Sequence, residues 1–316
     1  MAHTLNRRHL ILSAAALGST SVLPGCGGGG SDVDDRRNLV DLAASKPELS
    51  VFVEAVGAAG LADTLKVSGP FTVFAPNNDA FAGLLGELGL TKDALFADKA
   101  TITAVLKYHV LDKLVLRTEI PSGKAIVPIG GGFFKIDRVG DSYNVTDGRN
   151  RVSRVMATDS LALNGVLHVV DRVLLPANKD IVQTAQATPS LSILVAAVVA
   201  AGLADTLKGA GPFTVFAPTN DAFAALLVEL GVTQDALLAD KPTLTKVLTY
   251  HVLPARVLKT EIPFDTPIAT VQGSTLRVSS SLQITDQRGR ASNIAAADVF
   301  ASDGVVHVVD KVLLPS

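Results

Sequence analysis

The chain has 316 residues, of which 48% are hydrophobic and 18% are charged, and its formal net charge is −2 at pH 7. A weakly acidic chain without blocks of Lys and Arg lacks the clustered cations that neutralise phosphates, which argues against nucleic-acid binding and against electrostatic docking on anionic lipid. Cys26 is the single cysteine. No disulfide can therefore form within the chain, and exported domains must be stable through core burial alone.

The first 26 residues have the pattern of an export signal. Arg7 and Arg8 form a positive start, residues 9–22 are mostly apolar, and residues 23–26 read Leu-Pro-Gly-Cys. The apolar run is shorter than the roughly 20 residues that cross a bilayer, which indicates a signal peptide over residues 1–26. Its end resembles a bacterial lipobox, in which the thiol is diacylated, so Cys26 is the predicted lipidation site. The alternative is an ordinary secretory signal with an incidental thiol, and a resemblance to twin-arginine signals leaves the export route open.

Residues 27–37 read GGGGSDVDDRR and have no apolar periodicity. Such a segment cannot bury enough surface to order itself, which predicts a flexible tether. The predicted location is the outer membrane, the cell surface or the periplasm, with membrane contact through the lipid anchor alone. Secretion without an anchor is the alternative.

The rest of the chain contains one sequence twice. Residues 60–81 and 202–223 differ at three positions at a constant spacing of 142 residues, and the later blocks repeat at a spacing of 139. This period is too long for a solenoid repeat of about 20–50 residues and has the size of a complete domain with its own core. The sequence therefore predicts two like domains, at residues 38–176 and 177–316. The linker between them is short, so we expect a semi-rigid pair.

Each copy is predicted to be helical in its first half. Apolar residues at helical spacing predict helices over Leu39–Ala44, residues 49–65 and residues 101–108 of the first copy, and Gly60 is placed to break the second of these segments into two helices. A β-branched and aromatic run at residues 71–75 predicts a buried strand. Asn78 follows that strand and is predicted to cap the next helix.

The second half of each copy changes to strands. In the first copy these are predicted at residues 114–117, 124–127, 133–137, 143–146, 152–157 and 166–175. Asn164 and Gly165, like Asp303 and Gly304 in the second copy, are predicted to form a type I′ hairpin turn, which needs positive φ at both central positions. Helices followed by strands, without βαβ alternation, predict an α+β fold with a mostly antiparallel sheet.

Three blocks, in the same order in both copies, carry a resemblance to a known family. In the first copy, residues 71–81 read Phe-Thr-Val-Phe-Ala-Pro-Asn-Asn-Asp-Ala-Phe, Tyr108 and His109 come next, and residues 164–176 read Asn-Gly-Val-Leu-His-Val-Val-Asp-Arg-Val-Leu-Leu-Pro. Over nearly all of residues 38–316 the chain resembles tandem fasciclin (FAS1) domains. The resemblance implies a wedge of two β-sheets with helices packed over one side. It also implies membership of secreted or surface-anchored proteins associated with adhesion.

Four histidines repeat between the copies: His109 with His251, and His168 with His307. Two histidines per domain are where a metal or acid–base hypothesis begins. None of the four has a second histidine within a helical turn, no cysteine is available as a ligand, and all four adjoin Val or Leu residues. We therefore predict four core or half-buried histidines that are hydrogen-bonded to neighbouring groups, with no metal and no cofactor.

The resemblance adds two groups of candidate ligand-contact residues. In animal members of the family the Tyr-His pair is linked to integrin binding, and an Asn-Lys-Asp-Ile-Leu element is linked to adhesion. Residues 178–182 match that element except for Val at the last position. The candidate residues are Tyr108, His109, Tyr250, His251, Asp180 and Ile181. For the second group the residues themselves favour a simpler interpretation, in which Asp180 caps the first helix of domain two.

The chain contains no G-x-S-x-G motif, no P-loop and no G-x-G-x-x-G after a strand. We therefore expect an exported, lipid-anchored, non-catalytic adhesion or interaction protein. Its expected partner is a protein or a polysaccharide of the cell surface or matrix, and self-association belongs to the same expectation. The alternative is a periplasmic enzyme or small-molecule carrier with a pocket near the Tyr-His motifs.

Overall fold

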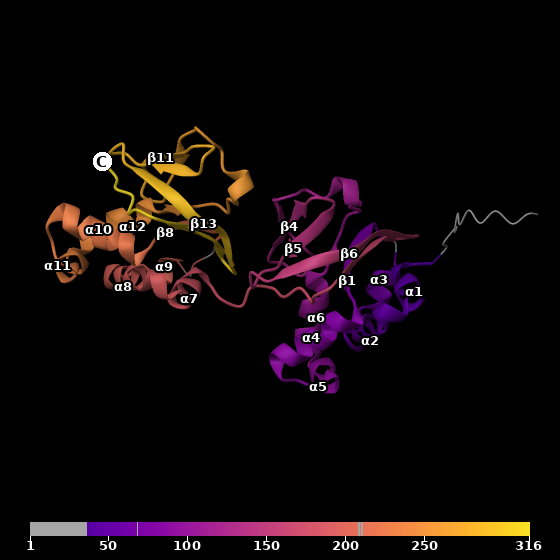
Figure 1. Ribbon diagram of the computed structural model, residues 1–316. Coiled ribbons are helices and arrows are strands. Elements are labelled where there is room, and N and C mark those ends of the chain that lie inside the picture. Colours follow the sequence, from indigo (N-terminus) through magenta and orange to yellow (C-terminus); the bar gives the residue numbers. More distant parts are fainter. Residues whose placement is uncertain (1–36, 68, 208, 210) are drawn as a thin grey trace, which may run out of the picture. The chain divides into compact units, whose positions relative to one another are not determined.

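A computed structural model describes residues 37–67, 69–207, 209 and 211–316, and Figure 1 shows them as a ribbon. The predicted signal peptide, the lipidation site Cys26 and all of the tether except its last residue lie outside the described residues. The described part belongs to one compact unit, Asp35–Ser316. Within that part, no helix combines the length and apolar character needed to cross a membrane.

The first domain begins with helices and ends with strands, as predicted. Its helices are α1 (Leu39–Ala44), α2 (Ser50–Ala58), α3 (Ala62–Lys66), α4 (Asn78–Leu88), α5 (Lys92–Ala97) and α6 (Lys99–Tyr108), with 3-10 turns η1 (Pro47–Leu49) and η2 (Arg117–Glu119). Its strands are β1 (Phe71–Pro76), β2 (Val110–Leu111), β3 (Ala125–Ile126), β4 (Phe134–Val139), β5 (Ser142–Thr146), β6 (Val152–Ala162) and β7 (Gly165–Val170).

The second domain repeats this order. Its helices are α7 (Ile181–Gln186), α8 (Ser192–Ala201), α9 (Ala204–Leu207), α10 (Asn220–Leu230), α11 (Gln234–Ala239) and α12 (Lys241–Tyr250), with 3-10 turns η3 (Pro189–Leu191) and η4 (Lys259–Glu261). Its strands are β8 (Phe213–Pro218), β9 (Val252–Leu253), β10 (Ile268–Ala269), β11 (Thr275–Val278), β12 (Gln283–Thr285), β13 (Ala291–Ala301) and β14 (Gly304–Val309).

Each domain has one seven-stranded sheet, ordered β2-β1-β7-β6-β5-β4-β3 in the first domain and β9-β8-β14-β13-β12-β11-β10 in the second. The first strand and the last are parallel, and the other pairs are antiparallel. The start of β6 pairs with β5, whereas the rest pairs with β7 through two register shifts between Val155 and Ser160. Irregularities of this kind bend a strand. The wedge is therefore one continuous sheet that folds over at β6.

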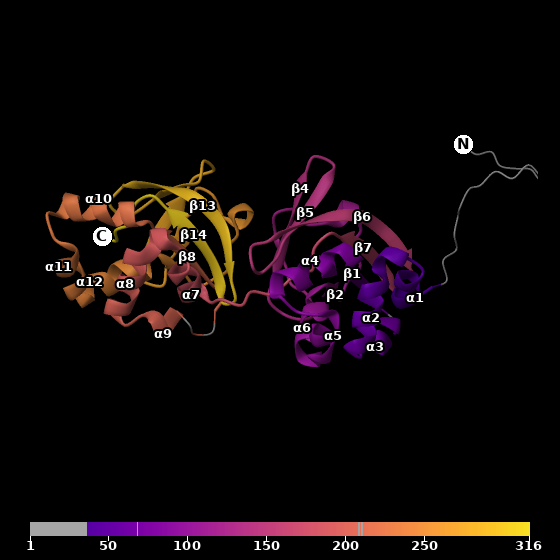
Figure 2. The same ribbon diagram turned by 60° about the horizontal axis from the view of Figure 1, so that its bottom comes forward.

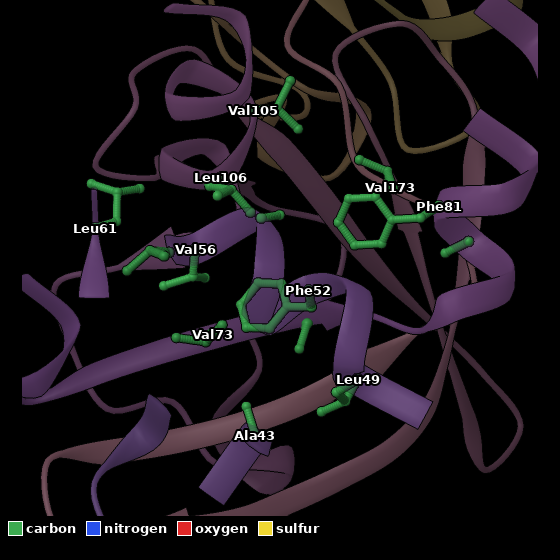
Figure 3. Close-up of a cluster of buried hydrophobic side chains, with 14 of the residues drawn as sticks. Ala43, Leu49, Phe52, Val56, Leu61, Val73, Phe81, Val105, Leu106 and Val173 are labelled. Atoms are coloured by element: carbon green, nitrogen blue, oxygen red, sulfur yellow. The ribbon is translucent and has the colours of Figure 1, made fainter. Parts of the chain in front are cut away.

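Two apolar cores stabilise the first domain. One lies between the helices and the sheet and contains Phe52, Val73 and Phe81 (Figure 3). The other contains residues from all seven strands, including Phe74 and Phe134, and is enclosed by the folded sheet. Successive side chains of a strand point to opposite faces, so Val73 and Phe74 enter different cores. The helices accordingly gather on one side of each sheet, as Figures 1 and 2 show.

The predicted helix cap is wrong by one residue. The N-cap of α4 is Asn77, whose side chain accepts a hydrogen bond in the first turn. Asn78 instead joins two helices: its Oδ1 accepts from Val51 N at 3.0 Å, and its Nδ2 donates to Pro47 O at 3.0 Å. Asn220 makes the same two kinds of bond in domain two.

Two segments predicted as strands, residues 114–117 and 171–175, are not strands. Their backbone donors bind side chains instead of a neighbouring strand. Val115 N donates to the Thr72 hydroxyl at 2.8 Å, and Leu174 N donates to a histidine ring. A run of β-branched residues predicts burial in an extended segment, but it does not show whether side chains replace the ladder.

The predicted type I′ turn is also wrong. Neither Asn164 nor Asp303 has positive φ, and Gly165 already pairs with Ala162 in the sheet. A Cβ at Gly165 would lie 2.1 Å from the carbonyl oxygen of Phe71. Glycine is therefore needed here because another strand passes so close.

Candidate functional site

The Tyr-His pair lies at the end of α6 and, in the second domain, of α12. The Nδ1 of His109 donates to Val105 O at 2.7 Å, and its Nε2 accepts from Leu174 N at 2.9 Å. Because Nε2 faces an N–H donor, the ring is neutral. His251 repeats the two bonds at 2.8 and 2.9 Å. Burial lowers the pKa of each of these rings to about 4.

The second pair of histidines lies in β7 and β14. The Nε2 of His168 donates to Val115 O at 2.9 Å, and its Nδ1 accepts from Asp159 N at 3.3 Å. His307 repeats these bonds at 2.9 and 3.2 Å. Burial lowers the pKa of both rings, and both are held neutral with the opposite tautomer to the first pair.

All four histidines are at most 1% exposed, which confirms the prediction of hydrogen-bonded core histidines. Each ring uses both nitrogens within the fold, so none has a free lone pair for a metal ion or for a transferred proton. Across the described ranges, no group of three or more His, Cys, Asp or Glu side chains is placed to hold a metal ion.

The tyrosines of the Tyr-His pairs are buried as well. The Tyr108 hydroxyl donates to Phe133 O, and the Tyr250 hydroxyl donates to Thr275 O at 2.9 Å. Burial raises the pKa of Tyr108 well above its usual value and that of Tyr250 to about 12. A ligand at the surface of the closed fold does not reach these side chains or the adjacent histidines. Ligand contact at the Tyr-His pairs stays a prediction, and the observed contacts of these residues are core contacts.

Asp180 and Ile181, the other candidate contact residues, begin α7. Asp180 is the N-cap, and it forms a capping box with Gln183: Gln183 N donates to Asp180 Oδ1 at 2.6 Å, and Asp180 N donates to Gln183 Oε1 at 3.0 Å. Ile181 is 3% exposed and packs in the helical core. The predicted capping role is confirmed, and ligand contact here also stays a prediction.

A buried carboxylate supports the loop after β5, and the sequence marks it only by an Asp-x-x-x-Arg spacing that both copies share. Asp147 is 1% exposed. Its oxygens accept from the backbone of Arg149, Arg151 and Leu175 and from the Arg151 guanidinium at 2.8 Å. Asp286 keeps the three backbone bonds in domain two. Asp147 and Asp286 therefore have a structural role, because their oxygens hold the backbone of the loop in place.

An ion pair joins the two domains. The Lys135 Nζ lies 2.7 Å from Asp298 Oδ2, and the two side chains are 16% and 5% exposed. The other oxygen of Asp298 accepts from Lys259 N at 2.7 Å. Burial lowers the pKa of Lys135, but the hydrogen bond and charge of Asp298 outweigh burial, so the pKa lies above its usual value. Lys135 is therefore charged at neutral pH.

Aromatic and amide contacts also join the two domains. The ring centroids of Phe133 and Phe300 lie 4.7 Å apart, and the Arg256 guanidinium lies 4.5 Å from the centroid of Phe133. The Asn150 side chain holds both backbone groups of Phe300: it accepts from the N–H at 2.7 Å and donates to the carbonyl at 3.1 Å. A paired, hydrogen-bonded arrangement of this kind constrains how the domains meet.

We name the two sides of this contact. The receiving face of domain one consists of Gly123, Phe133, Lys135 and Asn150. The inserting face of domain two consists of Arg256, Thr260, Asp298 and Phe300. The Thr260 hydroxyl donates to Gly123 O, which adds a further bond between the faces. Sequence reasoning missed both faces because the two copies differ at several of these positions, whereas the search for sites followed what the copies share.

Domain two also contains an apolar cavity of about 50 Å³ between its helices and its sheet, with Leu194, Thr249 and Val306 in its lining. The matching cavity of domain one is about 10 Å³, and Phe52 and Leu167 line it where domain two has the smaller Leu194 and Val306. The extra space in domain two follows from these two smaller side chains. The cavity adjoins the Tyr-His pair of α12 along the chain, but that pair does not line it.

Comparison with known proteins agrees with this architecture. The model of the fasciclin domain matches residues 47–176 and 189–315. The chain therefore belongs to the fasciclin domain family, and it contains two such domains in tandem.

The relatives include animal and bacterial proteins. The transforming growth factor-beta-induced protein ig-h3 of Sus scrofa is 31% identical over 250 residues, which are 78% of this chain and 35% of that protein. The chain thus spans about a third of the length of this relative. The cell surface glycolipoprotein MPB83 of Mycobacterium bovis is 33% identical over 144 residues, or 44% of this chain and 62% of that protein.

Among solved structures, a FAS1 domain pair from the insect cell adhesion molecule fasciclin I is similar. It matches 84% of this chain and 97% of its own length, with a TM-score of 0.43 and 18% sequence identity.

Proposed function

We propose that the chain is an exported, non-catalytic adhesion or interaction protein, held at the cell surface or in the periplasm by a lipid on Cys26. Its ligand is a protein or a polysaccharide of the cell surface or matrix. Family membership supports the adhesion setting, and the similarity to a cell surface glycolipoprotein supports the anchor. The two domains would act together on one partner.

The observation that carries this proposal is the contact between the domains. Two like domains offer two like surfaces, and binding at the first raises the local concentration of the second. Avidity is largest when the spacing is fixed, because a flexible linker spreads the second site over a large volume. The Lys135–Asp298 ion pair and the Asn150–Phe300 bonds restrict that spacing.

An array of matrix proteins and glycans tests the proposal. The lipid-free chain from Gly27 to Ser316 is applied beside Lys135→Met, which weakens the contact between the domains, and Lys241→Met, which removes an exposed cation of α12. We expect binding to fall by about tenfold or more in the first variant and to be unchanged in the second. Absence of binding to every matrix component would overturn the adhesion proposal.

A second candidate function is transport of a small apolar molecule, and the cavity of domain two favours it. Its volume of about 50 Å³ is several times the roughly 10–15 Å³ that one water-sized group needs, and an apolar cavity of this kind binds apolar groups better than water. Titration with xenon, followed by NMR of the methyl groups that line the cavity, tests this candidate. Leu194→Phe, which restores the side chain of Phe52, should abolish saturable binding, whereas Phe52→Leu should create a weak site in domain one. If Leu194→Phe binds as well as the unaltered chain, this candidate fails.

A further inference from the structure

The contact between the domains is made by two different faces, although the domains are copies of each other. Domain one contributes its receiving face and domain two its inserting face. Because the domains are copies, domain one also has residues at the positions that form the inserting face of domain two, and domain two has residues at the positions that form the receiving face of domain one. An inserting face on domain one and a receiving face on domain two therefore remain outside this contact.

The unused inserting face of domain one has exposed leucines at two of its four positions. Leu161 takes the position of Phe300 and is 58% exposed, and Leu114 takes that of Arg256 and is 43% exposed. Leu163 and Val67, which line the same surface hollow as Leu114 and Leu161, are 70% and 56% exposed. Four exposed apolar side chains around one surface hollow indicate an interaction surface.

The acceptor of this face is already in place. Asp159 takes the position of Asp298 and has the same left-handed backbone, with φ of 58° against 60°. Its Oδ1 accepts from Arg117 N at 2.8 Å, as that of Asp298 accepts from Lys259 N. The Oδ2 of Asp159 corresponds to the Asp298 oxygen that binds Lys135. This Asp159 oxygen has no hydrogen-bond or ion-pair partner among the described residues.

The path of the chain beside the two inserting faces is also the same. Leu163 N donates to Arg37 O at 3.0 Å, and Ser302 N donates to Lys179 O at 2.9 Å. The segment that enters domain one thus runs where the linker enters domain two. A second domain can therefore meet domain one as domain one meets domain two.

The unused receiving face of domain two carries the complementary charge. Arg277 of β11 takes the position of Lys135 of β4, because both are paired to the equivalent threonine of the next strand. Arg277 is exposed, and its guanidinium donates to Asp265 O at 2.9 Å. Thr275 takes the place of Phe133, and Gly289 that of Asn150. The cation is kept, whereas the aromatic and amide contacts are lost.

We propose that two copies of this chain associate head to tail, with the inserting face of domain one of one copy on the receiving face of domain two of the other. Arg277 pairs with Asp159, and Leu161 covers Thr275. The contact joins unlike faces, so each added copy leaves one of each face free and the assembly grows as an open chain. This contact is weaker than the contact within one copy, because Thr275 and Gly289 stand at the positions of Phe133 and Asn150 and cannot make the aromatic and amide contacts.

This inference rests on the proposed function, because it names a second copy as a partner of the surface protein. On a membrane, lipid-anchored copies would be concentrated in two dimensions, which favours a weak contact. The two ideas fail separately: a chain that binds matrix components but stays monomeric overturns only the head-to-tail contact.

Sedimentation velocity of the Gly27–Ser316 chain over a wide concentration range tests the contact. We expect reversible association that weakens with added salt. Arg277→Glu and Leu161→Ser should each weaken association by about tenfold or more. The matched controls are Lys241→Glu and Val228→Ser, which change an exposed cation on α12 and an 84% exposed valine on α10. Both controls should associate like the unaltered chain.

Mixing the two variants tests the polarity. The Arg277→Glu chain keeps its inserting face and the Leu161→Ser chain keeps its receiving face, so the mixture should form dimers but no longer chains. A contact between two like faces would not be restored in this way. The proposal is overturned by a chain that is monomeric at all concentrations, by association that these variants leave unchanged, or by a mixture that remains monomeric.

Discussion

Lys135 and Asp298 lie 2.7 Å apart across the boundary between the two domains, with the aspartate only 5% exposed. The Oδ2 of Asp137 also lies 3.3 Å from the Nζ of Lys135. A carboxylate this far buried needs its cation, because an unpaired buried charge costs several kcal/mol. The pair therefore couples the stability of one domain to that of the other.

Lys135→Met keeps the apolar stem and removes the charge. We expect a loss of about 1–3 kcal/mol in the free energy of unfolding, because Asp298 loses a charged hydrogen bond at a buried site. The two domains should also unfold in more clearly separate steps in calorimetry. Arg277→Met, at the equivalent but exposed position, should change the free energy by less than about 0.5 kcal/mol. A single unchanged transition in Lys135→Met would contradict the coupling.

The pKa of His109 and His251 makes stability depend on pH. Each ring has a folded pKa of about 4, against an unfolded value near 6.5. Their contribution is complete above pH 6.5 and is lost as the pH falls from 6.5 toward 4, since the unfolded chain binds the protons first. The shift corresponds to about 3 kcal/mol per ring.

Urea denaturation at pH 7 and at pH 4.5 measures this effect. His109→Gln should be less stable at pH 7 by about 1–3 kcal/mol, because the buried Leu174 N–H loses the ring nitrogen that accepts its hydrogen bond. The difference between this variant and the unaltered chain should shrink at pH 4.5. A difference that is the same at both pH values would show that the ring is not held neutral.

The duplicated domains and most helices could be predicted because repetition and helical periodicity are visible along the chain. Asp180 was predicted as a cap from its immediate neighbours, and the structure confirms it. The pairing of Phe133 with Phe300 could not be predicted, since the domain copies have Thr275 and Leu161 at these positions and nothing local links residues so far apart. The contact between the two domains is made by residues that differ between the copies, so a comparison of the copies does not reveal it.

Gly165→Ala tests whether glycine is needed at this position because β1 passes close to it. The added Cβ would lie 2.1 Å from Phe71 O, so β1 and β7 must separate, and we expect a loss of about 3 kcal/mol or more or a failure to fold. Gly86→Ala on α4 meets no atom within 4 Å and should gain about 0.5–1 kcal/mol from helix propensity. Thermal melts of both variants measure this. Equal stability of the two would rule out the steric explanation.

The predicted lipid at Cys26 has a direct test. Cys26→Ala should move the protein from the membrane fraction to the soluble fraction, because the acyl chains on this residue would supply the binding energy for the membrane. Cys26→Ser is the conservative control, and it should behave in the same way because the thioether cannot form. A variant that remains with membranes would contradict the lipoprotein prediction.

The last prediction exchanges one residue between the copies. In domain one, Asn164 accepts from Leu39 N and donates to the carbonyls of Leu65 and Val67 at 2.7 and 2.9 Å. Domain two has Asp303, whose Oδ1 accepts from Ile181 N at 2.8 Å. Its Oδ2 is buried and has no partner among the described residues, since a carboxylate cannot donate to a carbonyl.

Asp303→Asn should therefore stabilise the protein at pH 7 by about 1–2 kcal/mol, by adding a donor and removing a buried charge. Burial raises the pKa of Asp303, so the unaltered chain regains stability as the pH falls through that value and the acid becomes protonated. The advantage of the variant should shrink in acid. The reverse change, Asn164→Asp, should destabilise domain one at pH 7 by about 1–3 kcal/mol. Denaturation curves in which Asp303→Asn is no more stable at pH 7 would show that the unpaired oxygen carries no cost.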